Sequence, residues 1–360
     1  MEQEELIAYL LPGPSTPSII IQKINNIAHT LMSQIMYGDG DLFIDIYPTG
    51  SSQNSQVDPI LGFLVQYDIG KMKRISFKNN PKGLAVFLRV LAILKVGLKK
   101  GYMSTKRSIF YQDVILFETQ KTVDQTINDI ARCLEIPRAQ MGVVSCPKGF
   151  ISGKMKWTNE NGSITECWGQ IITIPSQPEK LKKICCSAKF IMVIEKESVF
   201  ARLTSTKLIE SVLMITGRGM PDFSTRYFVK MLQDIFNIPI LGLFDCDPYG
   251  LLIMQIYKYG SRIASYDASS MAICNLKWLG IRPSDMMRIP SSCLMDLTEK
   301  DQTILMGIRK QYYTESAWIN ECDLMLSYNK KAEIESLLSI ENNDLIDLYI
   351  PQKLNAYDWI

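Results

Sequence analysis

Three short apolar runs alternate with helix-like segments in the second half of the chain, and this alternation restricts the fold more than any other feature. The runs are "KFIMVIE", "SVLMIT" and "IPILGLFD", and each is followed by a segment with helical character: "KESVFARL", "GRGMPDFSTRYFVKMLQDIF" and "PYGLLIMQIYKYG". Strands that alternate with helices build βαβ units around a parallel sheet. The sequence therefore predicts an α/β fold with a mainly parallel sheet in this half.

Acidic residues stand where two of these runs end. Glu195 closes the first run, Asp245 closes the third, and Asp247 follows two residues later. Ligands of parallel sheets bind at the carboxyl ends of the strands, so the three side chains are expected at one edge. Carboxylates brought together raise one another's pKa, and a hard divalent cation removes that penalty. Oxygen ligands with open positions suit Mg²⁺ that is bound together with a substrate phosphate.

A purely structural interpretation of the same acids remains open from the residues alone. In it, Asp245 and Asp247 cap the helix that follows them, and Glu195 forms an ion pair with Lys189 or Lys196. Aspartate is a preferred N-cap residue, so this alternative needs no ligand.

The middle of the chain predicts three helices followed by a β-hairpin. "GLAVFLRVLAILKVGLKKGY" is apolar at helical spacing, Ser104 is an expected N-cap of a short second helix, and apolar residues recur three or four apart in Thr122–Ile136. In "MKWTNENGSITECW", the pair Asn161-Gly162 indicates a type I′ turn between two strands. This order is typical of a winged helix-turn-helix, a scaffold that docks on DNA.

A tyrosine in the predicted second helix is a candidate nucleophile. "KRSIFYQ" places Arg107 and Tyr111 four residues apart, on one helical face, with Lys106 beside them. A phenol with a pKa near ~10 is a weak nucleophile at neutral pH, and a nearby guanidinium and a metal-bound phosphate would favour its anion. The alternative is that these aromatic residues pack between helices and that the basic pair is solvated surface.

Several function classes are excluded by what the 360 residues lack. His29 is the only histidine, which argues against Ser-His-Asp catalysis and histidine zinc sites. The phosphate-binding pattern G-x-x-x-x-G-K-[ST] is missing, and no apolar run is long enough to predict a membrane span. The nine cysteines are scattered, which is typical of reduced thiols in a cytosolic or nuclear protein. With a net charge of +2, any nucleic-acid affinity must come from a local patch.

Four motifs, in their order and approximate spacing, resemble the topoisomerase VI A-subunit family, and most closely its meiotic branch of sporulation-eleven-type transesterases. They are "STKRSIFYQDVILF", "EKESVFARL", "ITGRGMPDFSTR" and "FDCDPYG". The ending "YIPQKLNAYDWI" is also similar to that of animal members. The resemblance covers residue 84 to the C-terminus. It implies an N-terminal extension over residues 1–80, a winged-helix domain over 81–175 and a magnesium-binding Toprim domain over 176–360.

The resemblance also implies residue roles and a reaction. Tyr111 matches the catalytic tyrosine and Arg107 the arginine that assists it, while Glu195, Asp245 and Asp247 match the acids that bind Mg²⁺. The expected reaction is a transesterification, in which Tyr111 attacks a DNA phosphodiester, stays linked to the 5′ end and releases a 3′ hydroxyl. The alternatives are a Toprim-type nuclease that uses the same acids to activate water, and a DNA-binding paralogue without activity.

Partners and DNA contacts follow from the resemblance as expectations. They are double-stranded DNA, a homodimer when active, a topoisomerase VI B-like partner, accessory meiotic proteins, a nuclear location and no membrane. Each dimer site would combine one protomer's tyrosine with its partner's metal. Besides Lys106, the family positions expected near DNA are Lys148, Arg218, Phe223 and Arg226, and for each a solvated charge or a packed aromatic is an equal alternative. Departures from the family pattern are Ser108, Cys246 and Tyr249.

Overall fold

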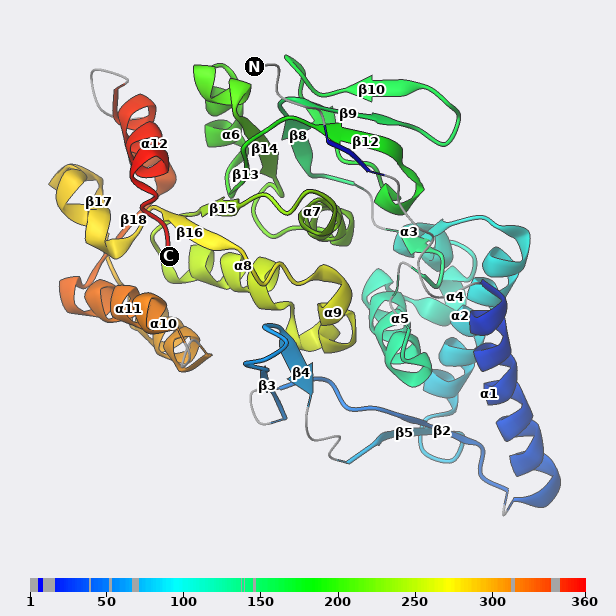
Figure 1. Ribbon diagram of the computed structural model, residues 1–360. Coiled ribbons are helices and arrows are strands. Elements are labelled where there is room, and N and C mark those ends of the chain that lie inside the picture. The colour runs from blue at the N-terminus through cyan, green and yellow to red at the C-terminus, as the bar shows by residue number, and fades with distance from the viewer. Residues whose placement is uncertain are drawn as a thin grey trace.

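The structure is a computed structural model that describes residues 6–8, 17–38, 40–51, 54–66, 71–136, 138, 140–144, 147–311, 315–337 and 344–360. Its buried apolar residues form two separate cores, one around a six-stranded sheet and one among the helices of the first half. Figure 1 shows these two bodies side by side, with α1, α2 and α5 on the right and the sheet with its helices on the left.

The six-stranded sheet confirms the predicted α/β fold. Its strand order is β11-β8-β14-β13-β15-β16, and β14, β13, β15 and β16 run parallel to one another, whereas β8 and β11 pair in antiparallel fashion. The three apolar runs of the sequence are β13, β14 and β15. In order along the chain, the strands are β8 (Phe150–Ser152), β11 (Ile172–Thr173), β13 (Phe190–Ile194), β14 (Val212–Thr216), β15 (Ile240–Leu243) and β16 (Lys277–Gly280).

The helices predicted between these strands are also present. They are α6 (Glu197–Thr204), α7 (Phe223–Phe236) and α8 (Pro248–Tyr259), and all three contribute buried side chains to the sheet's core. The chain then adds a mainly helical region that Figure 1 draws in yellow to red. Its elements are η3 (Arg262–Asp267), α9 (Ala268–Met271), η4 (Pro283–Arg288), η5 (Ser291–Cys293), β17 (Leu294–Asp296), α10 (Glu299–Gln311), α11 (Ser316–Tyr328), β18 (Lys330–Ala332), η6 (Ile334–Leu337) and α12 (Asp344–Ala356).

The chain ends on the edge strand of the sheet. Trp278 of β16 exchanges two backbone hydrogen bonds with Ile360, at 2.7 and 3.2 Å, and the ring of Trp359 lies against that of Phe190. These bonds pair part of a strand edge that would otherwise present free N–H and C=O groups.

The second body contains the predicted helices. They are α2 (Pro81–Lys100), α3 (Lys106–Phe110) and α5 (Gln120–Leu134). The same body also contains α1 (Pro17–Tyr37), α4 (Val114–Phe117) and a short parallel pair of β6 (Ser104–Thr105) and β7 (Val143–Val144). Helix α2 ends at Gly101, which adopts the left-handed conformation (φ 71°) that glycine permits. The predicted N-cap of α3 was wrong by one residue, because Thr105 and not Ser104 accepts a hydrogen bond from the N–H of Ser108.

The described residues between 17 and 76 share the core of these helices and also reach the sheet's body. The antiparallel pair β2 (Phe43–Ile46) and β5 (Lys73–Ser76) packs on α2 and α5, and buried residues of α1 belong to the same core. The second pair, β3 (Ser55–Val57) and β4 (Leu64–Gln66), lies against η3 and α9 of the other body. This segment therefore joins the two bodies.

The predicted hairpin is confirmed, but its turn type was wrong. Strands β9 (Met155–Thr158) and β10 (Ile164–Glu166) pair in antiparallel fashion. Of the Asn161-Gly162 pair only Gly162 has a positive φ (85°), and its N–H donates to the carbonyl of Asn159, which is not the type I′ geometry. The hairpin extends a second sheet, β1 (Leu6–Ala8)-β12 (Lys182–Cys186)-β9-β10. Met155 and Trp157 are buried in the sheet's core and not among the helices.

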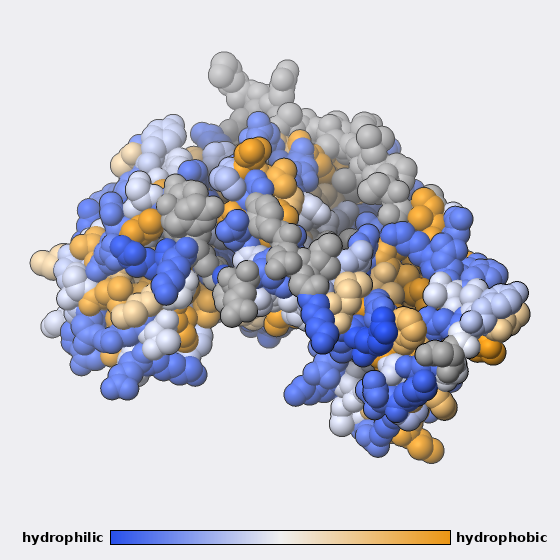
Figure 2. All heavy atoms as spheres, turned by 90° about the horizontal axis from the view of Figure 1, so that it is seen from below, coloured by the Kyte–Doolittle hydropathy of each residue, from blue (hydrophilic) through white to orange (hydrophobic). Residues whose placement is uncertain are grey.

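The surface of the molecule is divided into two lobes (Figure 2). Within the described ranges, no helix combines the length and the apolar character needed to cross a bilayer. Figure 2 shows the molecule from below as two lobes separated by a notch, with hydrophilic and apolar residues interspersed over both lobes.

Candidate active site

Glu195 and Asp245 lie side by side at the carboxyl edge of the sheet, as the sequence predicts. Strands β13 and β15 are parallel neighbours, with Ile194 opposite Leu243, so the residues that follow them emerge together. The N–H of Glu195 donates to the carbonyl of Leu243 at 3.0 Å, and the N–H of Asp245 donates to the Oε2 atom of Glu195 at 2.9 Å. Both acids are buried, with exposed fractions of 8% and 6%.

The loop that carries Asp245 is held on two sides by the backbone of other segments. Phe244 exchanges hydrogen bonds with Gly280 and Ile281 at the end of β16, at 2.8 and 2.9 Å. On the other side, Cys246 exchanges two hydrogen bonds with Ala332 of β18. The N–H of Ile334 then donates to the Oδ1 atom of Asp245 at 2.8 Å, so residues far along the chain fix this carboxylate.

Asp247 lies next to this pair but serves a second purpose. Its Oδ1 atom accepts a hydrogen bond of 2.6 Å from the N–H of Gly250, so it caps the N-terminus of α8. The helix-capping alternative is thus correct for Asp247, whereas the Asp245 carboxylate faces Ile334 and Lys196. Among the residues that the structure describes, no group of three or more His, Cys, Asp and Glu side chains is arranged to hold a metal ion.

The surroundings of the acids raise their pKa values. Burial, followed by the charge of Asp245, raises the pKa of Glu195 to about 8, although the N–H of Asp245 opposes this shift. Burial raises the pKa of Asp245 to about 6 against the N–H of Ile334 and the charge of Lys196. Burial also raises the pKa of Asp247. Buried carboxylates whose pKa values are raised mainly by desolvation are suited to bind a cation.

The donor set fits Mg²⁺ in its chemistry. Glu195, Asp245 and Asp247 offer carboxylate oxygens, the ligand type that this ion prefers, and Mg²⁺ is commonly held by one or two carboxylates together with water and substrate phosphate. Lys196 shows that a cation is already favoured here, because its Nζ atom lies 3.2 Å from the Oδ2 atom of Asp245. The chemistry of these side chains therefore suits a divalent cation.

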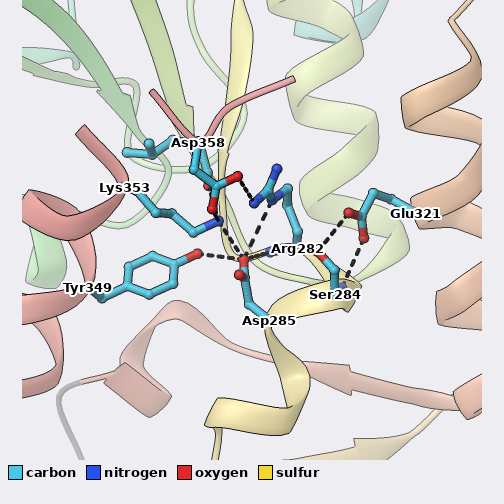
Figure 3. Close-up of polar contacts among 8 residues, drawn as sticks. Arg282, Ser284, Asp285, Glu321, Tyr349, Lys353 and Asp358 are labelled. Carbon is cyan, nitrogen blue, oxygen red and sulfur yellow. Dashed lines mark hydrogen bonds and ion pairs between the residues drawn. The ribbon is translucent and has the colours of Figure 1, made fainter. Parts of the chain in front are cut away.

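A buried network of charged side chains fixes helix α12 to the residues that end and follow strand β16 (Figure 3). Asp285 accepts hydrogen bonds from the hydroxyl of Tyr349 at 2.7 Å and from the Nζ atom of Lys353 at 2.9 Å, and Lys353 also donates to the carbonyl of Leu279 in β16. Arg282 pairs with Asp358 near the C-terminus. Helix α12 is thereby fixed to residues 279–285, which include the partners of Phe244.

A second branch of the same region runs to α11. Ser284 donates both its N–H and its hydroxyl to the carboxylate of Glu321, at 2.9 and 2.7 Å (Figure 3). The turn that follows β16 is therefore held by α11 and α12 together.

Tyr111 and Arg107 lie in the helical body and are open to solvent. Tyr111 is the C-cap of the five-residue helix α3, its N–H donates to the carbonyl of Arg107 at 3.1 Å, and its side chain is 65% exposed. Arg107 is exposed as well, one helical turn earlier. The ring of Phe110 contacts that of Tyr111 at a centroid distance of 5.4 Å. Thus Tyr111 is not packed between helices and can reach a substrate.

The local sequence explains where α3 begins and why the helix is short. Thr105 and Ser108 form a capping box, in which each side chain accepts the other's backbone N–H, at 3.0 and 2.9 Å. Ser108, one of the departures from the family pattern, therefore has a structural role that an acid at the same position would share. Downstream, Asp113 caps α4 and also pairs with Arg89 of α2, which anchors the chain just beyond Tyr111.

The structure does not bring the tyrosine and the acids of one chain together. Helix α3 packs on α5 and β6, and it shares the core of the helical body. Glu195 and Asp245 follow strands of the other body.

The basic residues expected near DNA have mixed surroundings. Lys106 pairs with Asp124, and Arg218 pairs with Glu197 at 2.8 Å while its guanidinium lies over the ring of Phe150. Lys148 is half-buried, and its N–H donates to Asp222 at 2.8 Å. Lys106 and Arg218 keep 38% and 41% of their side chains exposed, so both remain available to a phosphate.

The last two of these positions have a structural role. The ring of Phe223 stacks under the guanidinium of Arg138 at 3.9 Å, which agrees with the packed-aromatic alternative. Arg226 is only 3% exposed, so its side chain belongs to the interior of the body and not to a DNA-facing surface.

Sequence reasoning missed Glu333 and Glu335, which both contact the ammonium of Lys196. They lie more than a hundred residues from Lys196 along the chain, and the segment "KKAEIE" carries only an ordinary mixture of charges. No local signal could have identified them, because only the pairing of β18 with the Asp245 loop brings them there.

Comparisons with known proteins identify the family of the chain. The family model for the Toprim domain of topoisomerase 6 A subunits and Spo11 matches residues 190–354, and the model "Type IIB DNA topoisomerase" matches residues 82–143. The meiotic recombination protein SPO11 of Mus musculus is 33% identical over 96% of this chain and 90% of its own length. The chain belongs to the family of topoisomerase 6 A subunits and Spo11. It is thereby a member of the type IIB topoisomerase class of enzymes.

Other family members are similarly related. The A subunit of DNA topoisomerase 6 from Arabidopsis thaliana is 29% identical over 94% of this chain and 81% of its own length. The meiotic recombination protein W68 of Drosophila melanogaster is 27% identical over 93% of this chain and 97% of its own length. Coverage of this extent includes most of the first 80 residues, whereas the first of the two family-model matches begins at residue 82, close to the expected start near residue 84. The family Toprim match contains Glu195, Asp245 and Asp247, and the other match contains Arg107 and Tyr111.

Proposed function

We propose that this protein is a DNA transesterase that forms programmed meiotic double-strand breaks. The observation that carries the proposal is the buried pair of Glu195 and Asp245, whose carboxylates meet at the sheet's edge with raised pKa values. Mg²⁺ at these acids and Asp247 would supply positive charge next to the scissile phosphate, which is what phosphoryl transfer chiefly requires. The same acids without a nucleophile would support only hydrolysis by water.

Tyr111 supplies the nucleophile in this proposal. Its Oη atom forms a bond to the phosphorus of a DNA phosphodiester while the bond from phosphorus to the 3′ oxygen breaks. The phenol proton is lost as the bond forms, and the departing 3′ oxygen gains a proton to become a hydroxyl. The product is a 5′-phosphotyrosyl link. Arg107, one turn away on the same helical face, lies where its guanidinium can contact the negatively charged phosphate.

The placement of Tyr111 and of the acids in different bodies supports a dimeric site. Because α3 packs away from the acids within one chain, a site built from one protomer's Tyr111 and its partner's acids would join them. The helices α2, α3 and α5 would dock on double-stranded DNA, with phosphate contacts from Lys106, Lys148 and Arg218. Family relatives that are named as A subunits support a B-type partner, and the meiotic relatives support a nuclear location with accessory meiotic proteins.

The test is a denaturing immunoprecipitation of the protein from meiotic cells, followed by end-labelling of any attached DNA. Wild type is compared with Tyr111→Phe, Asp245→Asn and the control Tyr37→Phe, which removes the hydroxyl of a tyrosine that is 83% exposed on α1. We expect oligonucleotides bound covalently to wild type and control only. Covalent DNA on Tyr111→Phe would refute the proposed nucleophile. Breaks with free 5′ phosphates that persist in Tyr111→Phe would favour the water-activating nuclease.

A further inference from the structure

A second group of charged residues surrounds the proposed metal site, and it centres on Lys196. The Nζ atom of Lys196 lies 3.2 Å from Asp245 Oδ2 and 3.0 Å from Glu333 Oε2, and it also contacts the carboxylate of Glu335. One ammonium therefore bridges the most buried acid of the site and two acids that are more open to solvent. The exposed fractions of the side chains are 8% for Asp245, 53% for Glu333 and 38% for Glu335.

The two glutamates are fixed in place by the same segment that positions Asp245. They flank Ile334, whose N–H donates to Asp245 Oδ1, and the hydroxyl of Ser198 in α6 donates to Glu335 Oε1 at 2.9 Å. Lys196 immediately follows Glu195 and forms the N-cap position of α6. The ammonium and its three carboxylates are thus held by elements that also hold the metal site.

This arrangement creates a conflict when a divalent cation arrives. An ammonium so close to Asp245 neutralises that carboxylate, and it repels any cation that binds there. If Lys196 had no other partner, it would either block the site or be left as an unpaired charge. Glu333 and Glu335 remove this conflict because their two negative charges already contact the ammonium and can keep it paired.

We propose that Lys196 is an internal counter-ion of the metal site, which pairs with Asp245 until a divalent cation binds and is then retained by Glu333 and Glu335. The inference rests on the proposed function, since it takes the cation to bind at Asp245. It assigns to Glu333 and Glu335 a positioning role that acts through Lys196 and not through the metal ion itself.

The test is the affinity of the full chain for Mg²⁺ alone, measured by isothermal titration calorimetry after removal of metal. Lys196→Met removes the competing charge and should tighten binding roughly tenfold. The double variant Glu333→Gln, Glu335→Gln removes two of the three carboxylates that contact Lys196 and leaves that of Asp245. It should weaken Mg²⁺ binding by about the same factor. Controls are Lys180→Met and Glu160→Gln, which remove the same charges from an exposed ion pair of 3.1 Å.

The triple variant separates the inference from its alternatives. If the glutamates act through Lys196, then adding both substitutions to Lys196→Met should leave the tightened affinity within about twofold. A further tenfold loss in the triple variant would overturn the inference, because the glutamates would then act as ligands or as general negative charge. A fall in the number of bound ions in the double variant would identify them as ligands of a second ion, which overturns it too.

Failure of the proposed function gives a different result. If wild type binds Mg²⁺ and Asp245→Asn abolishes binding while Lys196→Met changes nothing, then only the counter-ion inference is wrong. If binding is absent from wild type, or is unchanged in Asp245→Asn, then the assignment of the metal to these acids is wrong, and the inference is wrong with it. Unfolding temperatures of the metal-free variants identify any that fail to fold.

Discussion

The two parts of the proposed catalytic machinery lie in opposite environments. Tyr111 is 65% exposed at the end of a five-residue helix, and its contacts include a backbone hydrogen bond and the ring of Phe110. Glu195 and Asp245 are 8% and 6% exposed, and segments from different parts of the chain fix their loop. The helical body thus presents the proposed nucleophile to solvent, whereas the sheet's body buries two acids whose pKa values are raised.

This difference separates the conditions for folding from those for catalysis. An exposed side chain contributes little to stability, so the chain is free to place a tyrosine there. Buried acids cost free energy unless they are compensated, so they persist only where the surrounding structure is rigid enough to hold them. Substitutions in the two environments should therefore differ in their effect on the free energy of unfolding.

The largest loss of stability is expected from breaking the charge network around Asp285, which fixes α12 to the end of β16. Asp285→Ala removes the carboxylate that accepts hydrogen bonds from Lys353 and Tyr349, and it leaves Lys353, which is 1% exposed, without that partner. Removal of one member of a buried ion pair costs about 3–5 kcal/mol. We expect a loss of this size in the free energy of unfolding, measured by urea denaturation in metal-free buffer.

The matched control for Asp285→Ala is Asp323→Ala. Asp323 pairs with Arg309 through two contacts, but both side chains are more than 40% exposed. An exposed pair of this kind contributes about 0.2–1 kcal/mol. Equal losses for the two variants would mean that the network in Figure 3 does not stabilise the fold more than an exposed ion pair does.

The second effect is a dependence of stability on pH that arises from the buried acids. Burial and Asp245 raise the pKa of Glu195 from 4.5 to about 8, so between these values the folded protein holds a proton that the unfolded chain has released. The free energy of unfolding therefore falls as pH rises through this window, by about 2 kcal/mol between pH 6 and 8. Urea denaturation at several pH values in metal-free buffer measures the slope.

Two comparisons sharpen the pH prediction. Glu195→Gln removes the titrating group and should flatten the slope between pH 6 and 8. Saturating Mg²⁺ should also flatten it for wild type, because the ion compensates the charge that otherwise forms unpaired. A slope that survives in Glu195→Gln would assign the titration to another group, such as Asp245, whose pKa is raised to about 6.

Much of this arrangement could be predicted from local sequence. The three apolar runs became β13, β14 and β15, because continuous apolar runs followed by helical periodicity leave few alternatives to a parallel sheet. That topology alone is enough to bring Glu195 and Asp245 to one edge. The exposure of Tyr111 could not be predicted in the same way, because the spacing of "KRSIFYQ" fits both a packed and a free aromatic.

What sequence reasoning missed depends on contacts between distant segments. The pairing of Cys246 with Ala332 brings Glu333 and Glu335 to Lys196. No pattern in "KKAEIE" predicts that pairing. The burial of Arg226 was missed for a similar reason, since a charged residue at a helix start is usually exposed. Turn geometry was also mispredicted, because Asn-Gly suits more than one turn type and the hairpin's hydrogen bonds decide between them.

The smallest effect is expected at the nucleophile itself. Tyr111→Phe removes a hydroxyl from a side chain that is 65% exposed, and such surface changes alter the free energy of unfolding by less than about 0.5 kcal/mol. Tyr349→Phe removes the same atom from a side chain that is 3% exposed and donates to the carboxylate of Asp285, so it should cost about 1.5–3 kcal/mol. Urea denaturation of both variants under one set of conditions gives the contrast.

This pair of variants decides how the loss of covalent DNA in Tyr111→Phe is to be explained. If Tyr111→Phe is as stable as wild type while Tyr349→Phe is not, then the absence of a DNA adduct reflects the missing nucleophile and not a damaged fold. If Tyr111→Phe costs as much as Tyr349→Phe, then the tyrosine is packed in the folded protein. In that case the contrast between an exposed nucleophile and buried acids would not hold. The groups that activate Tyr111 would then be expected among its neighbours in the helical body.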